Sequence, residues 1–299
     1  MERSTMLSGI HVPLITPFTV DGEVALESLE ELANELLAEG AAGLVALGTT
    51  AEVATLSADE KASVVEVAAR VCREHGAPLT IGAGNNDTLA SARELTALEA
   101  VPEAVAALTV VPYFTRPSEA GVIVHFTALA AVSPVPLVIY HIPYRTGQEL
   151  GAGTLRRLGE LPGVCGVKYA AGGITGATVE LMADLPDGFS VMAGDDIFLS
   201  PLLAMGAHGG ILASAHLATG AFDRLVKTWH AGDAAAAGAL GHRLARLSAA
   251  LFAEPNPTVL KGVLHAQGRI PSADVRLPLL PAAPESIEGA LRALDELAR

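Results

Sequence analysis

The stretch that decides the fold is IHVPLITPF at residues 10–18, followed by ALESLEELANELLAE at 25–39 and GLVAL at 43–47. An apolar run, a stretch with helical spacing that ends at Gly40, and a second apolar run follow one another here. Short, nearly continuous apolar runs are typical of strands in a parallel sheet that is covered on both faces. The stretch therefore predicts a strand–helix–strand unit.

The same alternation continues along the chain. The expected strands are residues 10–18, 43–47, 78–82, 106–112, 136–142, 164–169, 189–193 and 210–214. The expected helices between and after them are 25–39, 59–74, 89–100, 119–131, 154–161, 177–185, 197–205 and 222–230. Eight such units in series fit a closed barrel better than an open sheet. We predict an α/β protein with a (βα)8 TIM barrel.

The barrel does not account for the end of the sequence. Residues 233–251 are rich in Ala and Leu, and further helical patterns follow Pro257 and run over 285–299. We therefore expect two parts, a barrel over 1–232 and a C-terminal helical appendage over 233–299.

Composition narrows the class of protein. Of the 299 residues, 51% are hydrophobic and 17% are charged, with a net charge of −14, which is typical of a folded domain. Without a cluster of Lys and Arg, nucleic acid is not an expected partner. No apolar run of membrane-spanning length and no signal-peptide pattern is seen, so we expect no membrane partner. Cys72 and Cys165 are expected to be reduced buried thiols in a cytoplasmic protein.

Active sites of such barrels lie at the carboxyl ends of the strands, and one lysine stands there. The chain has four lysines, and only Lys168 follows an apolar strand pattern, VCGV at 164–167. Burial lowers the pKa of an ammonium, and a neutral amine is what attack on a carbonyl carbon requires. The alternative is a structural lysine paired with a carboxylate elsewhere in the chain.

Other strand ends carry polar groups. Thr49 and Thr50 follow the second strand, where hydroxyl and backbone N–H groups suit a carboxylate, although an ordinary helix start is the simpler interpretation. Tyr140 closes the fifth strand and offers a phenol for proton transfer, or only packing. Arg145 suits two-pronged carboxylate binding, or is simply a surface residue.

The seventh strand ends in Gly194-Asp-Asp. Two adjacent acids can bind a metal, but no third ligand stands at a fixed spacing, so we expect no metal site. Turn formation and helix capping are the favoured interpretation for the two aspartates.

Taken together, these motifs resemble the dihydrodipicolinate synthase / N-acetylneuraminate lyase family of class I, pyruvate-dependent aldolases. The resemblance spans nearly the whole chain, and its order is what makes it specific. The motifs are TPF at 16–18, GTTAE at 48–52, PYFTRPS at 112–118, YHIPYRTG at 140–147, GVK at 166–168, AGDD at 193–196, EPNP at 254–257 and RLP at 276–278.

The resemblance implies a role for each matching residue. Lys168 would form the Schiff base, Tyr140 would transfer protons above it, and Thr49 would join the proton relay as the third catalytic residue. The substrate-binding residues would be Thr50, Arg145, Ile211 and Gly194. It further implies a homo-oligomer, a dimer or tetramer, that needs no metal or organic cofactor.

Within the family, Arg145 favours the dihydrodipicolinate synthase branch, which condenses pyruvate with aspartate semialdehyde. Phe114 argues against it, because the family usually has there a tyrosine that serves a neighbouring subunit's relay, and a phenyl ring carries no proton. A catabolic 2-keto-3-deoxy sugar-acid aldolase or dehydratase is one alternative. The other is a paralogue that binds a 2-oxo acid and turns over little.

Overall fold

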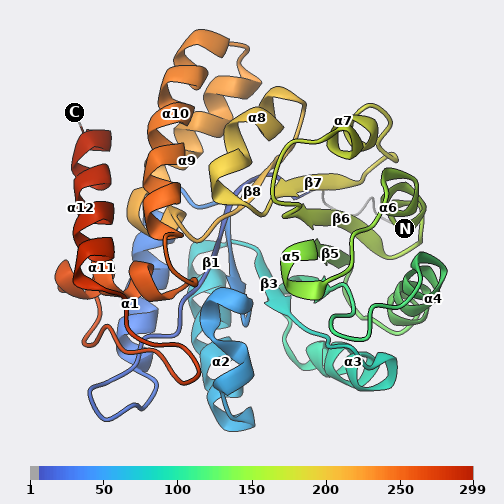
Figure 1. The fold of residues 1–299 in the computed structure, drawn as a ribbon. Coiled ribbons are helices and arrows are strands. Elements are labelled where there is room, and N and C mark those ends of the chain that lie inside the picture. The colour runs from blue at the N-terminus through green and yellow to red at the C-terminus, as the bar shows by residue number, and fades with distance from the viewer. Residues whose placement is uncertain (1–6, 299) are drawn as a thin grey trace. The chain divides into compact units, whose positions relative to one another are not determined.

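The computed structural model describes residues 7–298, and eight strands follow one another in it as hydrogen-bonded neighbours, closing a barrel in chain order. The strands are β1 (Gly9–Pro13), β2 (Gly43–Ala46), β3 (Leu79–Gly82), β4 (Ala104–Val110), β5 (Leu137–His141), β6 (Val164–Tyr169), β7 (Ser190–Ala193) and β8 (Gly209–Ile211) (Figure 1). The predicted (βα)8 barrel is confirmed; residues 1–6 and 299 of the predicted ranges lie outside the described residues.

Most α-helices agree with the amphipathic stretches to within a few residues, but the helix predicted over 222–230 begins earlier, at Ala215. They are α1 (Leu26–Ala38), α2 (Ala58–His75), α3 (Thr88–Thr96), α4 (Glu119–Ala130), α5 (Pro143–Thr146), α6 (Ala152–Gly159), α7 (Gly176–Met182), α8 (Leu199–Ala204), α9 (Ala215–His230), α10 (Ala234–Leu251), α11 (Thr258–Ala266) and α12 (Pro284–Ala298). Four 3₁₀ turns are η1 (Thr49–Ala51), η2 (Val53–Thr55), η3 (Ala97–Ala100) and η4 (Asp196–Phe198).

Local chemistry fixes where these helices begin and end. The Ser57 hydroxyl accepts from the Glu60 backbone N–H, and the Glu60 carboxylate accepts from the Ser57 N–H, so α2 opens on a capping box. The same helix ends at Gly76, whose φ of 63° suits a residue without a side chain. At the start of α3, the Asp87 carboxylate caps the helix by accepting from the Ala90 N–H.

Two further features differ from the sequence prediction. The first strand ends at Pro13 rather than at Phe18, because Phe18 pairs instead with Val24 in an isolated antiparallel bridge. The short helix α5 was not predicted; Pro143 begins it and Gly147, at φ 68°, ends it. Four residues are too few to show helical periodicity, and Pro at the first helical position is a favourable start.

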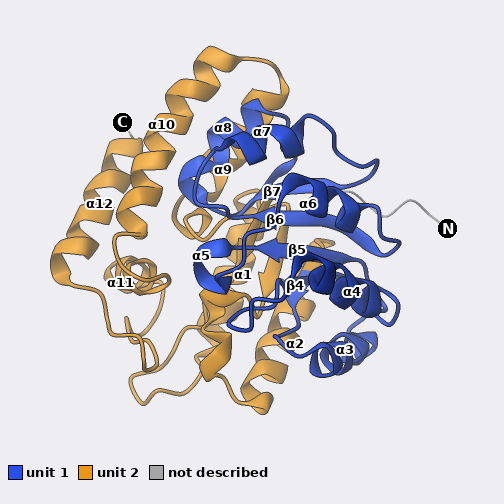
Figure 2. Cartoon of the chain, turned by 45° about the vertical axis from the view of Figure 1, so that its right-hand side comes forward, with its two compact units in different colours: residues 1–9, 80–211 blue, residues 10–79, 212–299 orange. Residues whose placement is uncertain are grey.

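The described residues divide into two units (Figure 2), and the first comprises residues 7–9 and 80–211. It contains β4 to β8 and the helices α3 to α8. Every residue of β5 is buried, as are the last five of β6, which fits a sheet covered on both faces. The parallel pairing of β5 with β6 places Tyr140 opposite Lys168, and that of β6 with β7 places Lys168 opposite Met192.

The second unit comprises residues 10–79 and 212–298 and contains α1, α2 and the helices α9 to α12. The helices α10 and α12 pack side by side (Figure 1). Their apolar residues share one core with Ile15 and with Leu32 of α1, and each fully buried Leu or Val contributes about 1.5–3 kcal/mol. The boundary predicted between residues 232 and 233 stays a prediction. Among residues 7–298, no helix is both long and apolar enough to cross a membrane.

Candidate active site

The Lys168 side chain ends against the ring of Tyr140 in the first unit. The two residues face one another across β5 and β6, and the Lys168 Nζ lies 4.4 Å from the centre of the Tyr140 ring. Lys168 is 6% exposed and Tyr140 is 7% exposed. The structure therefore brings together the two residues in which the sequence predicted an amine and a proton-transferring phenol.

The environment of Lys168 favours the neutral amine. Burial lowers the pKa of Lys168 to about 8, against the opposing pull of Asp196 and Asp195. Within residues 7–298, no carboxylate forms an ion pair with its Nζ. With a pKa of about 8, roughly a tenth of the amine is neutral at pH 7, so it can attack a carbonyl carbon.

Gly194 follows β7 and packs against the stem of Lys168. A Cβ at position 194 would lie 2.9 Å from the Lys168 Cγ and 3.0 Å from the Ala170 Cβ. Both distances are shorter than carbon atoms tolerate, so any side chain here would displace the lysine. The structure thus gives this glycine a packing contact with Lys168, whereas its predicted substrate contact stays a prediction.

The first of the two aspartates after Gly194 forms the predicted turn, since its backbone carbonyl accepts from the Phe198 N–H, but it does not cap a helix with its side chain. Asp195 precedes η4, but its side chain makes no capping hydrogen bond there. Its Oδ2 instead accepts from the Gly172 N–H at 2.7 Å, which ties the loop after β6 to the loop after β7. Burial raises the pKa of Asp195, and the Gly172 N–H and Lys168 oppose that rise. No cluster able to hold a metal ion occurs within the described range.

Arg145 lies in α5, directly after the strand that carries Tyr140. Its guanidinium carbon lies 4.8 Å from the centre of the exposed Tyr144 ring. Such a cation–π contact holds the guanidinium over the ring while leaving its N–H groups free to face solvent or an anion. Arg145 itself is exposed, as a residue that receives a substrate carboxylate must be.

Three further residues of this unit bear on the predicted chemistry. Ile211 is the last residue of β8 and is buried. Phe114 is 87% exposed with a left-handed φ of 66°. His141 follows Tyr140 on β5, so its side chain points to the opposite face of the strand, where its ring lies 5.6 Å from the Tyr169 ring. His141 therefore does not replace the hydroxyl that Phe114 lacks.

The two threonines belong to the second unit, where they form η1 after β2. Gly48, rather than a threonine, occupies the capping position, and it makes no side-chain cap. The Thr50 Oγ1 accepts a hydrogen bond from the Asn256 Nδ2 at 3.0 Å. Thr50 is buried and Thr49 is partly exposed. The ordinary helix start considered for this motif is therefore not what the loop forms.

A buried ion pair that no sequence pattern indicates follows these threonines. The Glu52 Oε1 lies 2.8 Å from the Lys261 Nζ, and both side chains are at most 2% exposed. The residues are 209 positions apart, and nothing in the helical pattern around Lys261 marks it as buried. Only the structure shows that the chain buries a second lysine.

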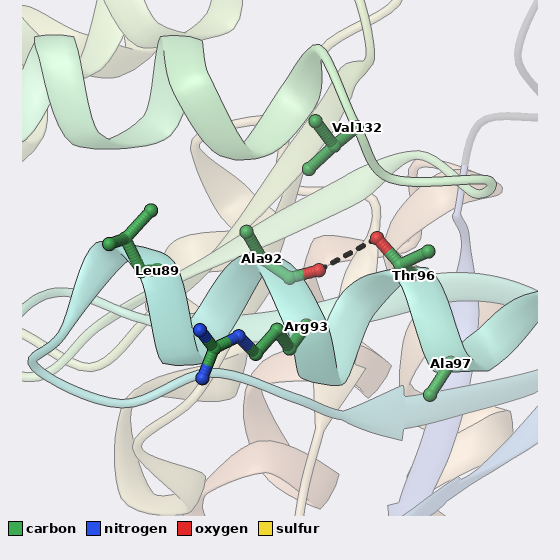
Figure 3. A pocket seen from close by; sticks show the side chains of 6 residues that line it. All are labelled: Leu89, Ala92, Arg93, Thr96, Ala97 and Val132. Carbon is green, nitrogen blue, oxygen red and sulfur yellow. Dashed lines mark hydrogen bonds between the residues drawn. The ribbon is translucent and has the colours of Figure 1, made fainter.

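A separate hollow lies on the surface of the first unit (Figure 3). It is lined by one side of α3, by η3 and by the second residue after α4, namely Leu89, Ala92, Arg93, Thr96, Ala97 and Val132. The Thr96 hydroxyl donates to the Ala92 carbonyl, so it is already satisfied within the helix. None of the predicted site residues lines this hollow.

Comparison with known proteins agrees with the motifs. The profile of the dihydrodipicolinate synthetase family matches residues 6–296. The 4-hydroxy-tetrahydrodipicolinate synthase 2 of Clostridium acetobutylicum is 38% identical, over 92% of this chain and 95% of that protein. The 4-hydroxy-tetrahydrodipicolinate synthase of Neisseria meningitidis serogroup B is 37% identical, over 98% of this chain and 100% of that protein.

Solved structures give the same result. The dihydrodipicolinate synthase of Acinetobacter baumannii, determined with pyruvate, superimposes with a TM-score of 0.92 at 34% identity, over 97% of this chain and 99% of that one. The family predicted from the motifs is confirmed, and with it the predicted class of enzyme, a lyase or aldolase of the Schiff-base type.

Proposed function

The chain belongs to the dihydrodipicolinate synthetase family, and from this premise we propose that it condenses pyruvate with aspartate semialdehyde through a Schiff base on Lys168. The observation that carries the proposal is the buried Lys168, whose pKa is lowered to about 8 and whose amine lies against the Tyr140 ring. A lysine so placed is a nucleophile for carbonyl carbons at neutral pH.

The proposed steps use the groups that lie beside Lys168. Its neutral amine attacks the ketone carbon of pyruvate, and the carbinolamine loses water while Tyr140 passes protons. The protonated imine draws electrons from C3, which loses a proton and becomes an enamine. This carbon forms a bond to the aldehyde carbon of the second substrate, whose oxygen takes up a proton. The amino group of that substrate then displaces Lys168 from the imine carbon and closes the ring.

Substrate binding is assigned to the remaining candidates. Thr49 and Thr50 bind the pyruvate carboxylate through hydroxyl and backbone N–H groups, and Thr49 also joins the proton relay. Ile211 lines the pyruvate position through its backbone. Arg145 receives the carboxylate of aspartate semialdehyde, which its exposure and its contact with Tyr144 support. No metal or organic cofactor enters the proposed chemistry.

The proposal extends to the state of the protein in the cell. Exposed apolar side chains on the first unit, among them Leu89 at 71% and Phe114 at 87%, support a homo-oligomer, a dimer or a tetramer. Cys72 and Cys165 are buried and form no disulfide, which supports a cytoplasmic location, where thiols stay reduced.

Phe114 favours a second candidate, a catabolic aldolase or dehydratase acting on 2-keto-3-deoxy sugar acids. Its phenyl ring carries no proton, so a relay through this position is missing. Turnover with aspartate semialdehyde, measured beside a panel of 2-keto-3-deoxy acids, separates the two. A response to the sugar acids alone would reject the synthase. A response to neither, with pyruvate still bound, would indicate a paralogue of low activity.

Trapping the imine tests the proposal directly. Wild-type protein is mixed with pyruvate and borohydride, and the intact mass is compared with that of Lys168→Ala. We expect a reduced pyruvate adduct on the wild type and none on the variant. If the wild type gains no adduct, pyruvate is not the substrate, and the same experiment with other 2-oxo acids identifies the one that is.

A further inference from the structure

The carboxylate of Glu52 is fully occupied although the residue lies in a loop. Its Oε1 pairs with the Lys261 Nζ at 2.8 Å, and its Oε2 accepts from the Arg276 backbone N–H at 2.8 Å. The residue has a left-handed φ of 55°, unusual for anything but glycine. The loop is therefore held from the C-terminal part of the second unit, in a shape it would not favour alone.

Aromatic and cationic groups enclose this ion pair. Two cations lie against the Phe18 ring, the Lys261 Nζ at 4.0 Å and the Arg276 guanidinium carbon at 4.5 Å from its centre. The Arg276 guanidinium also donates to the Thr55 carbonyl at 2.8 Å and forms an ion pair with Glu60. The stretch from 52 to 60 is thus held at both its ends.

Stability alone does not account for a pair of this kind. Removing two charges from water costs several kcal/mol each, and a pair of apolar residues is often as stable or more so. The pair instead fixes the conformation of the loop, because each buried charge finds its partner in only one arrangement of the backbone. Glu52 lies two residues after Thr50. Fixing the position of Glu52 therefore also fixes the backbone of Thr49 and Thr50.

Asn256 adds a direct contact with the same loop. Because its Nδ2 donates to the Thr50 Oγ1, the threonine oxygen acts as an acceptor there, and the hydroxyl hydrogen points elsewhere. The Thr16 hydroxyl donates to the carbonyl of Ala51 at 2.8 Å, so the residue between Thr50 and Glu52 is held as well. A hydroxyl oriented in this way is prepared to donate to an anion.

We propose that Glu52, Lys261 and Asn256 are positioning residues, which hold the loop of Thr49 and Thr50 in the shape that binds the carboxylate of a 2-oxo acid. The inference rests on the proposed function, in which these threonines bind pyruvate. It assigns a role in substrate affinity to residues that lie outside the reacting groups, one of them 209 positions along the chain from Glu52.

The test compares Glu52→Gln, Lys261→Met and the double variant. Each single change leaves one buried charge alone and is expected to destabilise the fold, whereas the double change removes both charges and should restore the melting temperature. The pyruvate concentration that gives half-maximal adduct with borohydride is then measured. We expect at least a tenfold rise in the double variant, with a trapping rate at saturating pyruvate that is close to wild type.

Two further variants sharpen the result. Asn256→Ala should raise the half-saturating pyruvate concentration in the same way, since it releases the Thr50 hydroxyl. The matched control is Asp223→Asn with Lys227→Met, which removes an exposed ion pair of 2.7 Å and should change neither value. A stable double variant with wild-type half-saturation would show that the pair is only structural and would overturn the inference.

Hydrogen exchange separates this inference from the proposed function. Exchange at the amides of residues 48–56 should be faster in the double variant than in the wild type, whether or not pyruvate binds. If the wild type forms no adduct but the loop still loosens, the proposed substrate is wrong and the positioning role stands. If exchange in the loop is unchanged, the positioning role is wrong.

Discussion

Two lysines are buried in this protein, one in each unit, and they differ in the partner that each has. Burial lowers the pKa of Lys261 too, but the carboxylate of Glu52, 2.8 Å from its Nζ, opposes that fall through its charge and its hydrogen bond. Lys168 has a ring of Tyr140 beside it, forms no ion pair within residues 7–298, and has a pKa lowered to about 8. Burial alone thus does not make a lysine a nucleophile; burial without a paired carboxylate does.

The largest expected effect is the loss of chemistry when the unpaired lysine is removed. Lys168→Ala should lower kcat/KM by at least ~10³-fold, because no other neutral amine stands in its place. Steady-state turnover measures the loss of activity, and peptide mapping identifies the lysine that carries the trapped adduct. An adduct found on Lys261 in this variant would break the distinction between the two residues.

Stability should respond to the two lysines with opposite signs. Lys261→Met leaves the Glu52 carboxylate buried and unpaired, so the free energy of unfolding should fall by about 3–5 kcal/mol. Lys168→Met replaces a desolvated amine with an apolar chain and should leave stability unchanged or raise it by about 1 kcal/mol. Denaturant unfolding of both variants beside the wild type gives the comparison; two equal losses would contradict it.

The contact of Gly194 with the stem of Lys168 predicts a loss of rate from adding one methyl group. Gly194→Ala places a Cβ 2.9 Å from the Lys168 Cγ and should lower the rate of imine formation by about 10- to 100-fold, since small misplacements are costly. Gly153→Ala is the matched control, because a Cβ there meets nothing within 4 Å. Equal rates in the two variants would show that the lysine moves aside freely.

The pKa of Lys168 predicts the pH dependence of the first step. Its reactive form is neutral, so the rate of imine formation should rise about tenfold per pH unit below a pKa of about 8 and level off above it. An ordinary lysine would continue to rise to about pH 10. Borohydride trapping over a pH series measures the profile, and a rise that continues past pH 9 would place Lys168 with the ordinary amines.

The smallest effect is expected at Phe114. Restoring the hydroxyl with Phe114→Tyr should raise turnover with aspartate semialdehyde by up to about tenfold, less than a directly acting proton donor contributes. Tyr144→Phe is the companion variant, because its phenol is exposed and lies beside Arg145. An unchanged rate in Phe114→Tyr would favour a different second substrate over a missing relay.

The barrel and the position of Lys168 could both be predicted from the sequence, and for the same reason. A charged residue near the end of an apolar run stands out, and the period of the runs fixes which edge of the barrel it occupies. The short helix α5 was not predicted, since four residues carry no periodic pattern. Its consequence, the placement of Arg145 over Tyr144, followed only from the structure.

Lys261 shows where sequence reasoning ends. Residues 258–264 are all buried, so α11 has no polar face along this stretch by which its lysine could be judged exposed or buried. Its partner Glu52 follows the GTTA motif, where the sequence allows an ordinary helix start and nothing marks a buried ion pair. Pairing between residues 209 positions apart is a property of the tertiary fold, and one sequence holds no record of it.

The burial of two lysines has a practical consequence for chemical labelling. Of the four lysine side chains, only those of Lys61 and Lys227 reach solvent. Amine-directed dyes, cross-linkers and surface-coupling reagents should therefore attach to few sites, and both of these side chains belong to the second unit. Immobilisation through exposed lysine side chains would therefore take place on the second unit.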